Sequence, residues 1–529
     1  MDFDVLIVGY GPVGAALAGL LGRYGVRALV VDKALEVFTA PRAIALDNEA
    51  LRILQQVGVG ARDFARMPVP YVVLRSPQFG EIARIDTSKV IDGHPMLVTF
   101  FQPELERALR ANVERQATVT ARTGMELVQF TEEADGIRAL LRSTDGTEEF
   151  VRARYLVGAD GASSSVRTSI GESFDGATYV EDWLIVDALD LPNTIDHVEF
   201  ICDPKRPGPH MAAPGGRTRW EFMLHPGERR DEMLKDTAIS ELLRPWTSPG
   251  EYRLERKAVY RFHARACAHF SKGRVFLVGD AAHITPPFVG QGLVAGLRDA
   301  ANLAWKLAWV TQQRAAASIL DSYDLERRPH AKKMIDLARF AGLFIMPRSR
   351  AWAWLAHGSL KVLRHLPPFK SFISDFGMKP AHAYDNGLFA RGSGRLARGA
   401  WLPQGEVRDS HGTTLLSDEA FGHGFTLLCS AAAPPAIGAD TARRWERLGG
   451  TTVVLHAQGS APKPGSFEDA TGAFAKLTRD EWCVVVRPDR TTLHDGPVSD
   501  AERVLRESLD LLGIRDAAAA SGGLNATSF

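Results

Sequence analysis

The chain has 529 residues, of which 45% are hydrophobic and 24% are charged, and its 63 Lys and Arg residues balance its 63 Asp and Glu residues. This length predicts about two to four domains with cores of their own. A net charge of zero creates no field that attracts a polyanion, so nucleic acid is not an expected partner.

Cysteine usage and the N-terminus indicate the compartment. The four cysteines lie far apart in the sequence, with no C-x-x-C pair and no zinc-ligand spacing. We therefore expect no disulfide, no metal and a reducing, cytoplasmic location. The first apolar run is short and follows no basic segment, so no signal peptide is expected. No apolar run reaches the length of a membrane-spanning helix, so no membrane partner is expected.

A strand–helix–strand unit is predicted at the start of the chain. Residues 4–9 (DVLIVG) form a continuous apolar run rich in β-branched residues, which is typical of a strand buried on both faces. Residues 15–24 follow with the small and apolar residues of a helix, and residues 28–31 form a second apolar strand. This order is that of a βαβ unit.

The pattern G-x-G-x-x-G follows the first strand, at Gly9, Gly11 and Gly14. The first glycine allows a tight turn, the second lets the backbone approach a pyrophosphate, and the third lets the helix pack closely on the strand. Free N–H groups at the helix N-terminus then face the phosphates. Asp32 ends the second strand, where a carboxylate accepts hydrogen bonds from a ribose. The motif predicts a dinucleotide site but does not distinguish FAD from NAD.

Helices and strands alternate along the remaining chain, and the residue pattern changes at two places. Helices are expected at residues 43–57, 102–114, 292–312 and 333–366 (broken by Pro347), and strands at 71–75, 96–99, 125–130, 137–142, 155–158 and 274–278. Residues 175–270 hold short alternating segments broken by Pro and Gly, which predict an antiparallel sheet. Beyond a composition change near 390–410, strands at 425–429, 452–456 and 483–486 predict a small α/β domain.

Two aspartates follow predicted strands. Asp160 precedes a run of serines that suits the start of a helix, so its segment is either a ligand site or a turn with a helix cap. Asp280 stands at the end of a buried strand, where a carboxylate is costly unless it is hydrogen-bonded. A ribityl hydroxyl of a flavin would satisfy that carboxylate.

A glycine-rich helix start comes after Asp280 and the pair Pro286-Pro287. Its first residues are Gly290, Gln291, Gly292 and Leu293. Unpaired N–H groups there carry a partial positive charge, which would stabilise negative charge on a reduced flavin. The alternative is a plain strand–turn–helix with a rigid proline pair.

These three motifs, in this order, resemble those of the class A flavoprotein monooxygenases, the fold of p-hydroxybenzoate hydroxylase and phenol hydroxylase. The resemblance covers about residues 1–345. It implies an α/β fold with a Rossmann-like FAD-binding domain, an inserted antiparallel-sheet substrate domain and a C-terminal thioredoxin-like domain. The expected domains are an FAD domain at 1–174 (with a substrate-domain excursion near 71–99) and 271–345, a substrate sheet at 175–270, a helical connector at 346–398 and a thioredoxin-like domain lacking C-x-x-C at 399–529.

The resemblance also assigns cofactor contacts residue by residue. It places Arg42 near the FAD phosphates, Gln102 and Asp280 on the ribityl chain, and a residue near Val128 against the adenine. Asp160 is expected near the pyrophosphate, with a part in nicotinamide binding. The other expected FAD contacts are Gly9, Gly11, Pro12, Val13, Gly14, Asp32, Lys33, Pro287, Gly290, Gln291, Gly292 and Leu293. Val289 and Val294 depart from the Gly and Asn that the family often has at these positions.

Residues 46–52 and 199–228 resemble the 3-(3-hydroxyphenyl)propionate hydroxylase branch, and residues 400–529 resemble its C-terminal domain. This implies that NAD(P)H reduces FAD, that O₂ gives a flavin C4a-hydroperoxide, and that a phenol is hydroxylated next to its hydroxyl in aromatic catabolism. A homodimer is implied as well. A polyketide-aromatic hydroxylase, a Baeyer–Villiger monooxygenase, an oxidase and an FAD-binding protein without turnover remain alternatives.

Candidate substrate residues follow from position. Asp47 is a candidate for the base that deprotonates the phenol, the alternative being an exposed helix carboxylate. Trp220 and Phe222 share one strand face and are candidates for the substrate wall, whereas Arg219 on the other face is a candidate carboxylate anchor. Pro286 is expected to turn its carbonyl toward a substrate hydroxyl. The tryptophan-containing segment 341–356 is expected to pack as a buried helix instead of binding a membrane.

Overall fold

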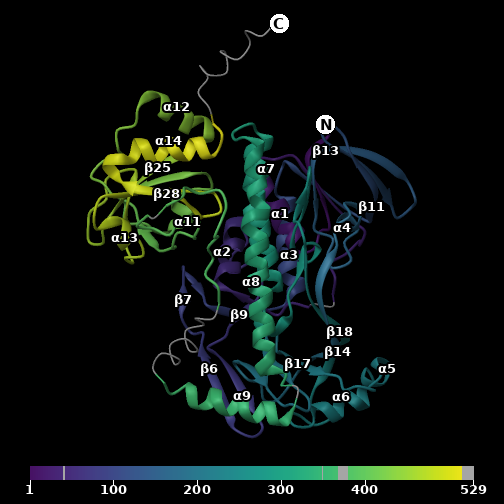
Figure 1. Ribbon diagram of the computed structural model, residues 1–529. Coiled ribbons are helices and arrows are strands. Elements are labelled where there is room, and N and C mark those ends of the chain that lie inside the picture. Colours follow the sequence, from purple (N-terminus) through teal and green to yellow (C-terminus); the bar gives the residue numbers. More distant parts are fainter. Residues whose placement is uncertain (40–41, 348, 367–378, 393, 515–529) are drawn as a thin grey trace. The chain divides into compact units, whose positions relative to one another are not determined.

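The computed structural model describes residues 1–39, 42–347, 349–366, 379–392 and 394–514 (Figure 1). The chain forms two compact units. Unit 1 comprises Met1–Gly19, Leu29–Ala300 and Ala331–Pro380, and unit 2 comprises Leu20–Ala28, Ala301–His330 and Ala381–Phe529. No helix in the described ranges is long and apolar enough to cross a membrane.

One sheet carries the dinucleotide motifs. Its strand order is β10-β2-β1-β13-β12-β11, with β20 beside β13 and β19 beside β20. Both β1 and β20 run parallel to β13, so the carboxyl ends of these three strands meet at one edge. Gly9, Asp160 and Asp280 lie just beyond that edge. The bounds are β1 (Phe3–Val8), β2 (Ala28–Asp32), β10 (Val119–Thr123), β11 (Met125–Glu132), β12 (Ile137–Ser143), β13 (Glu148–Gly158), β19 (Ser271–Lys272) and β20 (Val275–Leu277). The strands predicted around the three motifs are confirmed.

A second sheet of unit 1 has the order β21-β18-β14-β17-β16-β15-β5-β6. It is antiparallel except where β5 runs parallel to β15, so the antiparallel sheet predicted for residues 175–270 is confirmed. Figure 1 shows β14, β17 and β18 together in this sheet. Its bounds are β5 (Tyr71–Ser76), β6 (Gly80–Asp86), β14 (Phe174–Leu189), β15 (Val198–Ile201), β16 (Gly208–Ala213), β17 (Arg217–Met223), β18 (Arg253–Cys267) and β21 (His283–Ile284).

The alternation of side chains along β14 and β17 divides the second sheet into two faces. Leu184 and Val186 pack with Trp220 and Phe222 in an apolar core that also contains Ile239 of α6 (Asp236–Leu243). The residues of opposite parity on these strands point to the other face, because successive side chains of a strand alternate. The short helix α5 (Arg230–Met233) precedes α6.

The helix expected at residues 43–57 begins later than predicted. Residues Ala45–Asp47 form strand β3, and α2 spans only Asn48–Val57. The cause is the Asp47 side chain, which accepts a hydrogen bond from the Ala50 N–H at 2.9 Å and so caps the helix. β3 pairs with β9 (Leu97–Phe100), which pairs with β4 (Arg66–Pro68).

Several further helices belong to unit 1 or contribute residues to both units. They are α1 (Pro12–Arg23), α3 (Gln102–Glu114), α4 (Ser165–Ser169), α7 (Gly292–Thr311), α8 (Ser322–Ile345) and α9 (Arg350–Leu363), and a small hairpin is formed by β7 (Val90–Ile91) and β8 (His94–Pro95). The long helix predicted at 292–312 is confirmed. The helical stretch predicted at 333–366 is divided between α8 and α9, with Pro347 between them.

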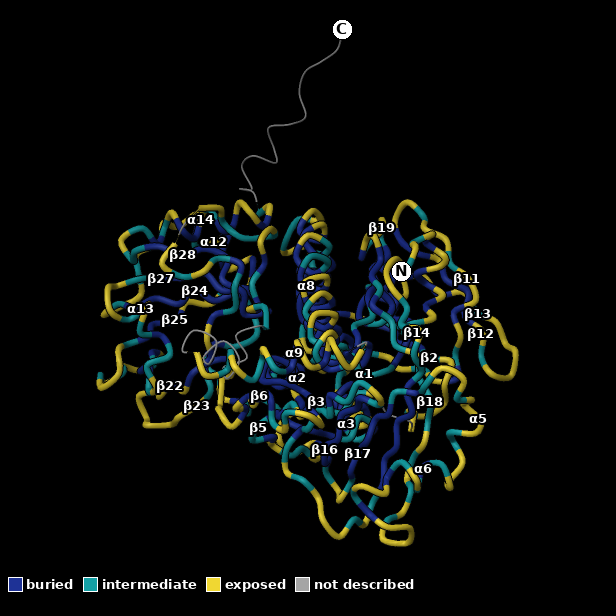
Figure 2. The backbone as a smooth tube through the Cα atoms, turned by 60° about the horizontal axis from the view of Figure 1, so that its bottom comes forward, coloured by how far each residue is buried: buried dark blue, intermediate teal, exposed yellow. Residues whose placement is uncertain are grey.

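Unit 2 is built on a sheet of order β23-β22-β26-β25-β24-β27-β28. Its buried centre includes Leu428 and Val484, and its central strands are dark blue in Figure 2. Cys429 and Cys483, distant in sequence, lie opposite each other on β24 and β27. The bounds are β22 (Glu406–Arg408), β23 (Thr414–Leu416), β24 (Thr426–Cys429), β25 (Thr451–His456), β26 (Ser466–Asp469), β27 (Trp482–Val486), β28 (Thr492–Pro497), α11 (Ser417–Ala420), α12 (Ala439–Leu448), α13 (Ala475–Thr478) and α14 (Ala501–Leu511).

A buried ionic cluster lies inside unit 2. Glu326 of α8 accepts hydrogen bonds from Arg487 at 2.7 and 2.9 Å and from Lys306 of α7 at 2.8 Å. Arg487 also pairs with Asp489. Burial raises the pKa of Glu326, but Arg487 and Lys306 outweigh it and hold that pKa well below its usual range. The carboxylate therefore stays charged, and its partners satisfy it.

Candidate active site

A cavity of about 1270 Å³ opens within unit 1. One part of its wall is the edge of the first sheet with the dinucleotide motifs, and another is the face of the second sheet that lies opposite the Trp220 core. Pockets for a single drug-sized ligand are typically about 300–1,000 Å³. The cavity therefore has room for a dinucleotide and a second small molecule.

The glycine turn exposes the backbone at Gly11 to the cavity. Gly9 has a left-handed φ of 106°, and a Cβ on it would lie 2.3 Å from the Ala159 carbonyl oxygen. Gly11 lines the cavity and has open space where its Cβ would be, as the approach of a pyrophosphate requires. Gly14 does not line the cavity, and a Cβ on it would lie 2.0 Å from the Gly9 oxygen. Its part is close packing of the helix on the strand.

Asp32 is fixed at the end of β2 beside this turn. Its Oδ2 accepts a hydrogen bond from the Tyr10 N–H at 2.7 Å, and its Oδ1 accepts one from the Ala34 N–H at 2.8 Å. The carboxylate and the neighbouring Lys33 both line the cavity. A carboxylate held this way suits a ribose hydroxyl pair, so the residues present fit the adenosine half of FAD.

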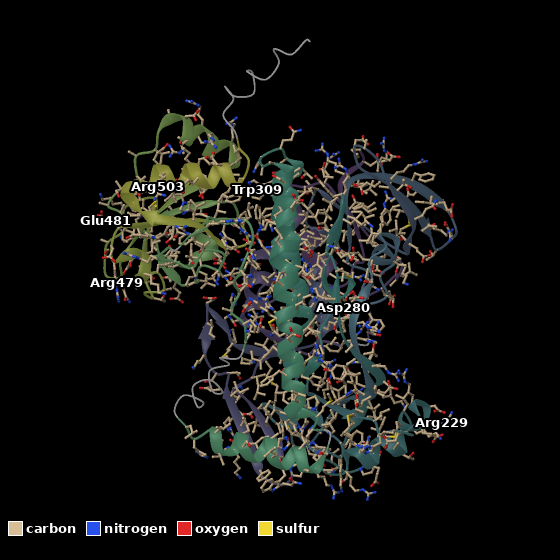
Figure 3. The ribbon with its side chains drawn as sticks, viewed as in Figure 1. Arg229, Asp280, Trp309, Arg479, Glu481 and Arg503 are labelled. Atoms are coloured by element: carbon tan, nitrogen blue, oxygen red, sulfur yellow. The ribbon has the colours of Figure 1, made fainter. Side chains whose placement is uncertain are left out.

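Arg42, Gln102 and Asp280 come together from three distant segments. Arg42 Nη1 lies 3.5 Å from Asp280 Oδ2, and the Gln102 Oε1 accepts hydrogen bonds from the backbone N–H groups of Arg42 at 3.1 Å and Ala43 at 3.0 Å. All of them line the cavity, and Asp280 is labelled in Figure 3. Their donors and acceptors suit the phosphate and ribityl groups that the resemblance implies for them, and these contacts stay predictions.

Asp160 lines the cavity and also caps α4. Its carboxylate accepts hydrogen bonds from the N–H groups of Ser165 at 2.7 Å and Val166 at 3.2 Å, and one from the Ser164 hydroxyl. The interpretation as a turn with a helix cap is therefore confirmed, and the interpretation as a ligand site stays a prediction. The contact with a nicotinamide stays a prediction.

The helix start that follows Asp280 borders the same cavity. Pro287, Gly290, Gly292 and Leu293 line it, and Gly290 is left-handed with φ of 63°. Gln291 lines it as well, but its side-chain amide donates to Asp47 Oδ2 at 3.0 Å. Pro12 and Val13 complete the predicted lining.

Two of the expected contacts near the cofactor and substrate lie elsewhere. Val128 is 37% exposed and stands at a bulge between Leu127 and Gln129, so the residues that reach the cavity are Met125, Glu126 and Leu127. Pro286 is buried and does not line the cavity, whereas the adjacent Pro287 does.

The substrate wall predicted at Trp220 and Phe222 is wrong. Both side chains lie in the apolar core on the far face of the sheet. Arg219 faces the other way, but it is 2% exposed and donates to both oxygens of Asp187, at 2.6 and 2.9 Å. It is therefore committed inside the protein and does not line the cavity. The alternation in the sequence identified the two faces of strand β17, but it did not show which face lines the cavity.

Asp47 lies at the cavity, but its carboxylate is already occupied. Besides capping α2, it accepts hydrogen bonds from Lys379 at 2.7 Å and from Gln291, and Arg298 lies 3.5 Å away. Burial raises the pKa of Asp47, but Lys379 and Arg298 outweigh it, so the pKa is lowered overall. A base needs a free lone pair and a pKa near the working pH. The contacts instead favour a positioning role for Asp47.

Several lining residues had no signal in the sequence. Trp183 of β14, Phe262 of β18 and Phe288 form a cluster of rings with centroids 5.4 to 6.4 Å apart. Further apolar side chains come from β5, β15, β16, α8 and α9, among them Leu74, Phe200, Met211, Phe340, Phe344 and Trp352. The polar residues Glu221, Tyr260 and Arg261 also line this part of the cavity. A periodic sequence pattern shows that such positions are apolar or polar, but it does not show that they share a chamber.

Two protein-family models match separate parts of the chain. Residues 2–338 match the family described as FAD binding domain, and residues 399–511 match the HcaD C-terminal domain. The 3-(3-hydroxy-phenyl)propionate/3-hydroxycinnamic acid hydroxylase of Mycobacterium sp. (strain JLS) is 37% identical over 506 residues, or 92% of this chain and 88% of the relative. The protein of the same name from Comamonas testosteroni is 37% identical over 78% of this chain and 71% of the relative.

Solved structures show the same fold. The flavin-dependent monooxygenase PieE in complex with FAD and substrate superposes with a TM-score of 0.81 at 22% identity, over 97% of this chain and 100% of that chain. A ternary complex of aklavinone-11 hydroxylase with FAD and aklavinone gives a TM-score of 0.76 at 25% identity, over 96% and 99%.

The fold and the cavity define an FAD-dependent monooxygenase of class A. The chain belongs to the FAD-binding hydroxylase family that includes the 3-(3-hydroxyphenyl)propionate/3-hydroxycinnamic acid hydroxylases. The predicted family, fold class, enzyme class and FAD cofactor are thus confirmed, and NAD(P)H and O₂ are the co-substrates of this class.

Proposed function

We propose that this enzyme hydroxylates a small phenol next to its existing hydroxyl, with 3-(3-hydroxyphenyl)propionate or 3-hydroxycinnamate as the substrate class. One observation carries the proposal. A single cavity joins the dinucleotide edge of the first sheet to an aromatic chamber beside the second sheet, which is the part of the cavity around Trp183, Phe262 and Phe288. The names of the relatives support the choice of substrate.

The chain's own residues would bind the cofactor and keep the chamber dry. Bound FAD supplies the hydride acceptance and the oxygen activation that side chains do not provide. Asp32 would hold the adenosine of FAD, Gly11 and Arg42 its pyrophosphate, and Gln102 and Asp280 its ribityl chain. The rings of Trp183, Phe262 and Phe288 would stack on a phenol and exclude water from the reacting carbon.

A substrate panel tests the proposal. The FAD-loaded enzyme is assayed for NADH and for NADPH oxidation with 3-(3-hydroxyphenyl)propionate, with 3-hydroxycinnamate and with a polycyclic phenol. Stimulation by the two small acids, with a catechol product, is expected. Stimulation by the polycyclic phenol alone would favour a polyketide-aromatic hydroxylase, the alternative that the match to aklavinone-11 hydroxylase suggests. A cytoplasmic location, a homodimer and the absence of nucleic-acid and membrane partners stay predictions.

A further inference from the structure

Glu221 is an acid inside the aromatic chamber. It lies on β17 opposite Ile185 of β14, and its side chain lines the cavity although the residue is only 6% exposed. Among the described lining residues that the second sheet contributes, it is the only Asp or Glu. Burying a carboxyl group costs free energy unless a partner binds it, so its presence at this position calls for an explanation.

The structure gives Glu221 charged neighbours but no bound partner. Within the described ranges, no hydrogen bond reaches its carboxylate. Arg219 is committed to Asp187, and Arg256 of β18 lies 3.3 Å from Asp187 and donates to the Tyr260 hydroxyl at 2.7 Å. The Glu221 oxygens therefore keep lone pairs that a ligand in the cavity can use.

The electrostatic setting suits proton transfer near neutrality. Burial raises the pKa of Glu221 to about 7, with Arg219 and Arg256 lowering it and Asp187 raising it. These residues and Tyr260 are the titratable or charged groups that face Glu221 from β17, β14 and β18. A general base works best when its pKa lies near the operating pH.

We propose that Glu221 is the catalytic residue that accepts the proton of the substrate hydroxyl, an inference that rests on the proposed function. The phenol O–H bond breaks, a bond forms between that proton and a Glu221 carboxylate oxygen, and the electron pair stays on the phenol oxygen. The phenolate makes the ring carbon next to it a stronger nucleophile. Tyr260, whose hydroxyl oxygen already accepts from Arg256, has its own O–H left to donate to the phenolate.

The test follows the ionisation of the bound substrate. FAD-loaded wild type, Glu221→Gln and Glu199→Gln are mixed with 3-(3-hydroxyphenyl)propionate, and the ultraviolet difference spectrum of the phenolate is recorded from about pH 6 to 9. Glu199 is a matched control, because it lies on β15 of the same sheet, pairs with Arg75 and does not line the cavity. Substrate-dependent NAD(P)H oxidation and catechol formation are measured in the same samples.

The wild type and Glu199→Gln should show phenolate at neutral pH. Glu221→Gln should show none there and should form catechol on the order of a hundredfold more slowly, recovering as rising pH ionises the phenol itself. Glu221→Asp, which keeps the charge, should restore part of the neutral-pH rate. An unchanged pH profile in Glu221→Gln, with the wild type active, overturns the role of Glu221. A wild type that no phenol stimulates overturns the proposed function, and this inference with it.

Discussion

Arg42 Nη1 lies 3.5 Å from Asp280 Oδ2, although the two residues stand far apart in the sequence. The pair joins the segment after β2 to the end of β20, and both side chains line the cavity while remaining partly exposed, at 60% and 38%. An exposed ion pair contributes little to stability. We expect the pair to supply a cation for the FAD phosphates and a carboxylate for the ribityl chain.

Replacing Asp280 tests this arrangement. Asp280→Ala should weaken FAD binding by about 2 kcal/mol, or roughly thirtyfold in Kd, because a charged hydrogen-bond acceptor is lost. The thermal stability of the FAD-free protein should change little. FAD binding is measured by fluorescence titration, with Asp336→Ala on the exposed side of α8 as the control. Equal affinity in Asp280→Ala and wild type would remove Asp280 from the cofactor site.

The glycine turn predicts opposite results at two positions. Gly11→Val places a side chain in open cavity space, so the protein should fold and lose FAD. Gly14→Ala forces a Cβ to within 2.0 Å of the Gly9 oxygen, so the fold itself should lose about 1–3 kcal/mol. Chemical unfolding and flavin content, measured together, separate the two. A Gly11→Val protein that retains its yellow flavin would contradict the assignment.

Asp47 is expected to hold Gln291 and Lys379 in place at the cavity, and not to accept a proton from the substrate. Its folded-state pKa is lower than that of an unfolded chain, so it stabilises the protein above the unfolded pKa and loses this contribution as pH falls through the folded value. Asp47→Asn should therefore be less stable at neutral pH and should differ less from wild type in acid. The pH profile of hydroxylation should keep its shape. A shifted profile would restore the role of base to Asp47.

Replacing a single member of the ionic cluster of unit 2 should destabilise the protein strongly. Glu326→Gln leaves Arg487 and Lys306 without their shared carboxylate and should cost about 3–5 kcal/mol. Glu446→Gln, at an exposed position of α12, should stay within about 0.5 kcal/mol of the wild type. Urea unfolding of both variants measures the difference. A small effect for Glu326→Gln would mean that water or another acid replaces it.

The meeting of the dinucleotide motifs at one cavity could be predicted because their signals are local. A glycine turn such as Gly9–Gly11 and a strand-end acid such as Asp280 are each defined by a few consecutive residues. The substrate half could not be predicted. Glu221 faces the chamber because β17 pairs with β14 in one register, and a sequence pattern shows two faces without showing which meets the ligand. The contact of Lys379 with Asp47 depends likewise on a long-range approach.

The most direct measurement follows oxygen from O₂ into the product. The FAD-loaded enzyme receives isotopically heavy O₂, NAD(P)H and 3-(3-hydroxyphenyl)propionate, and the mass of the product is determined by mass spectrometry. The proposed function predicts a catechol that carries one heavy oxygen atom, formed with about one NAD(P)H consumed for each product molecule. NAD(P)H consumed with peroxide and no labelled catechol would contradict it, and would show that the chamber belongs to a different substrate.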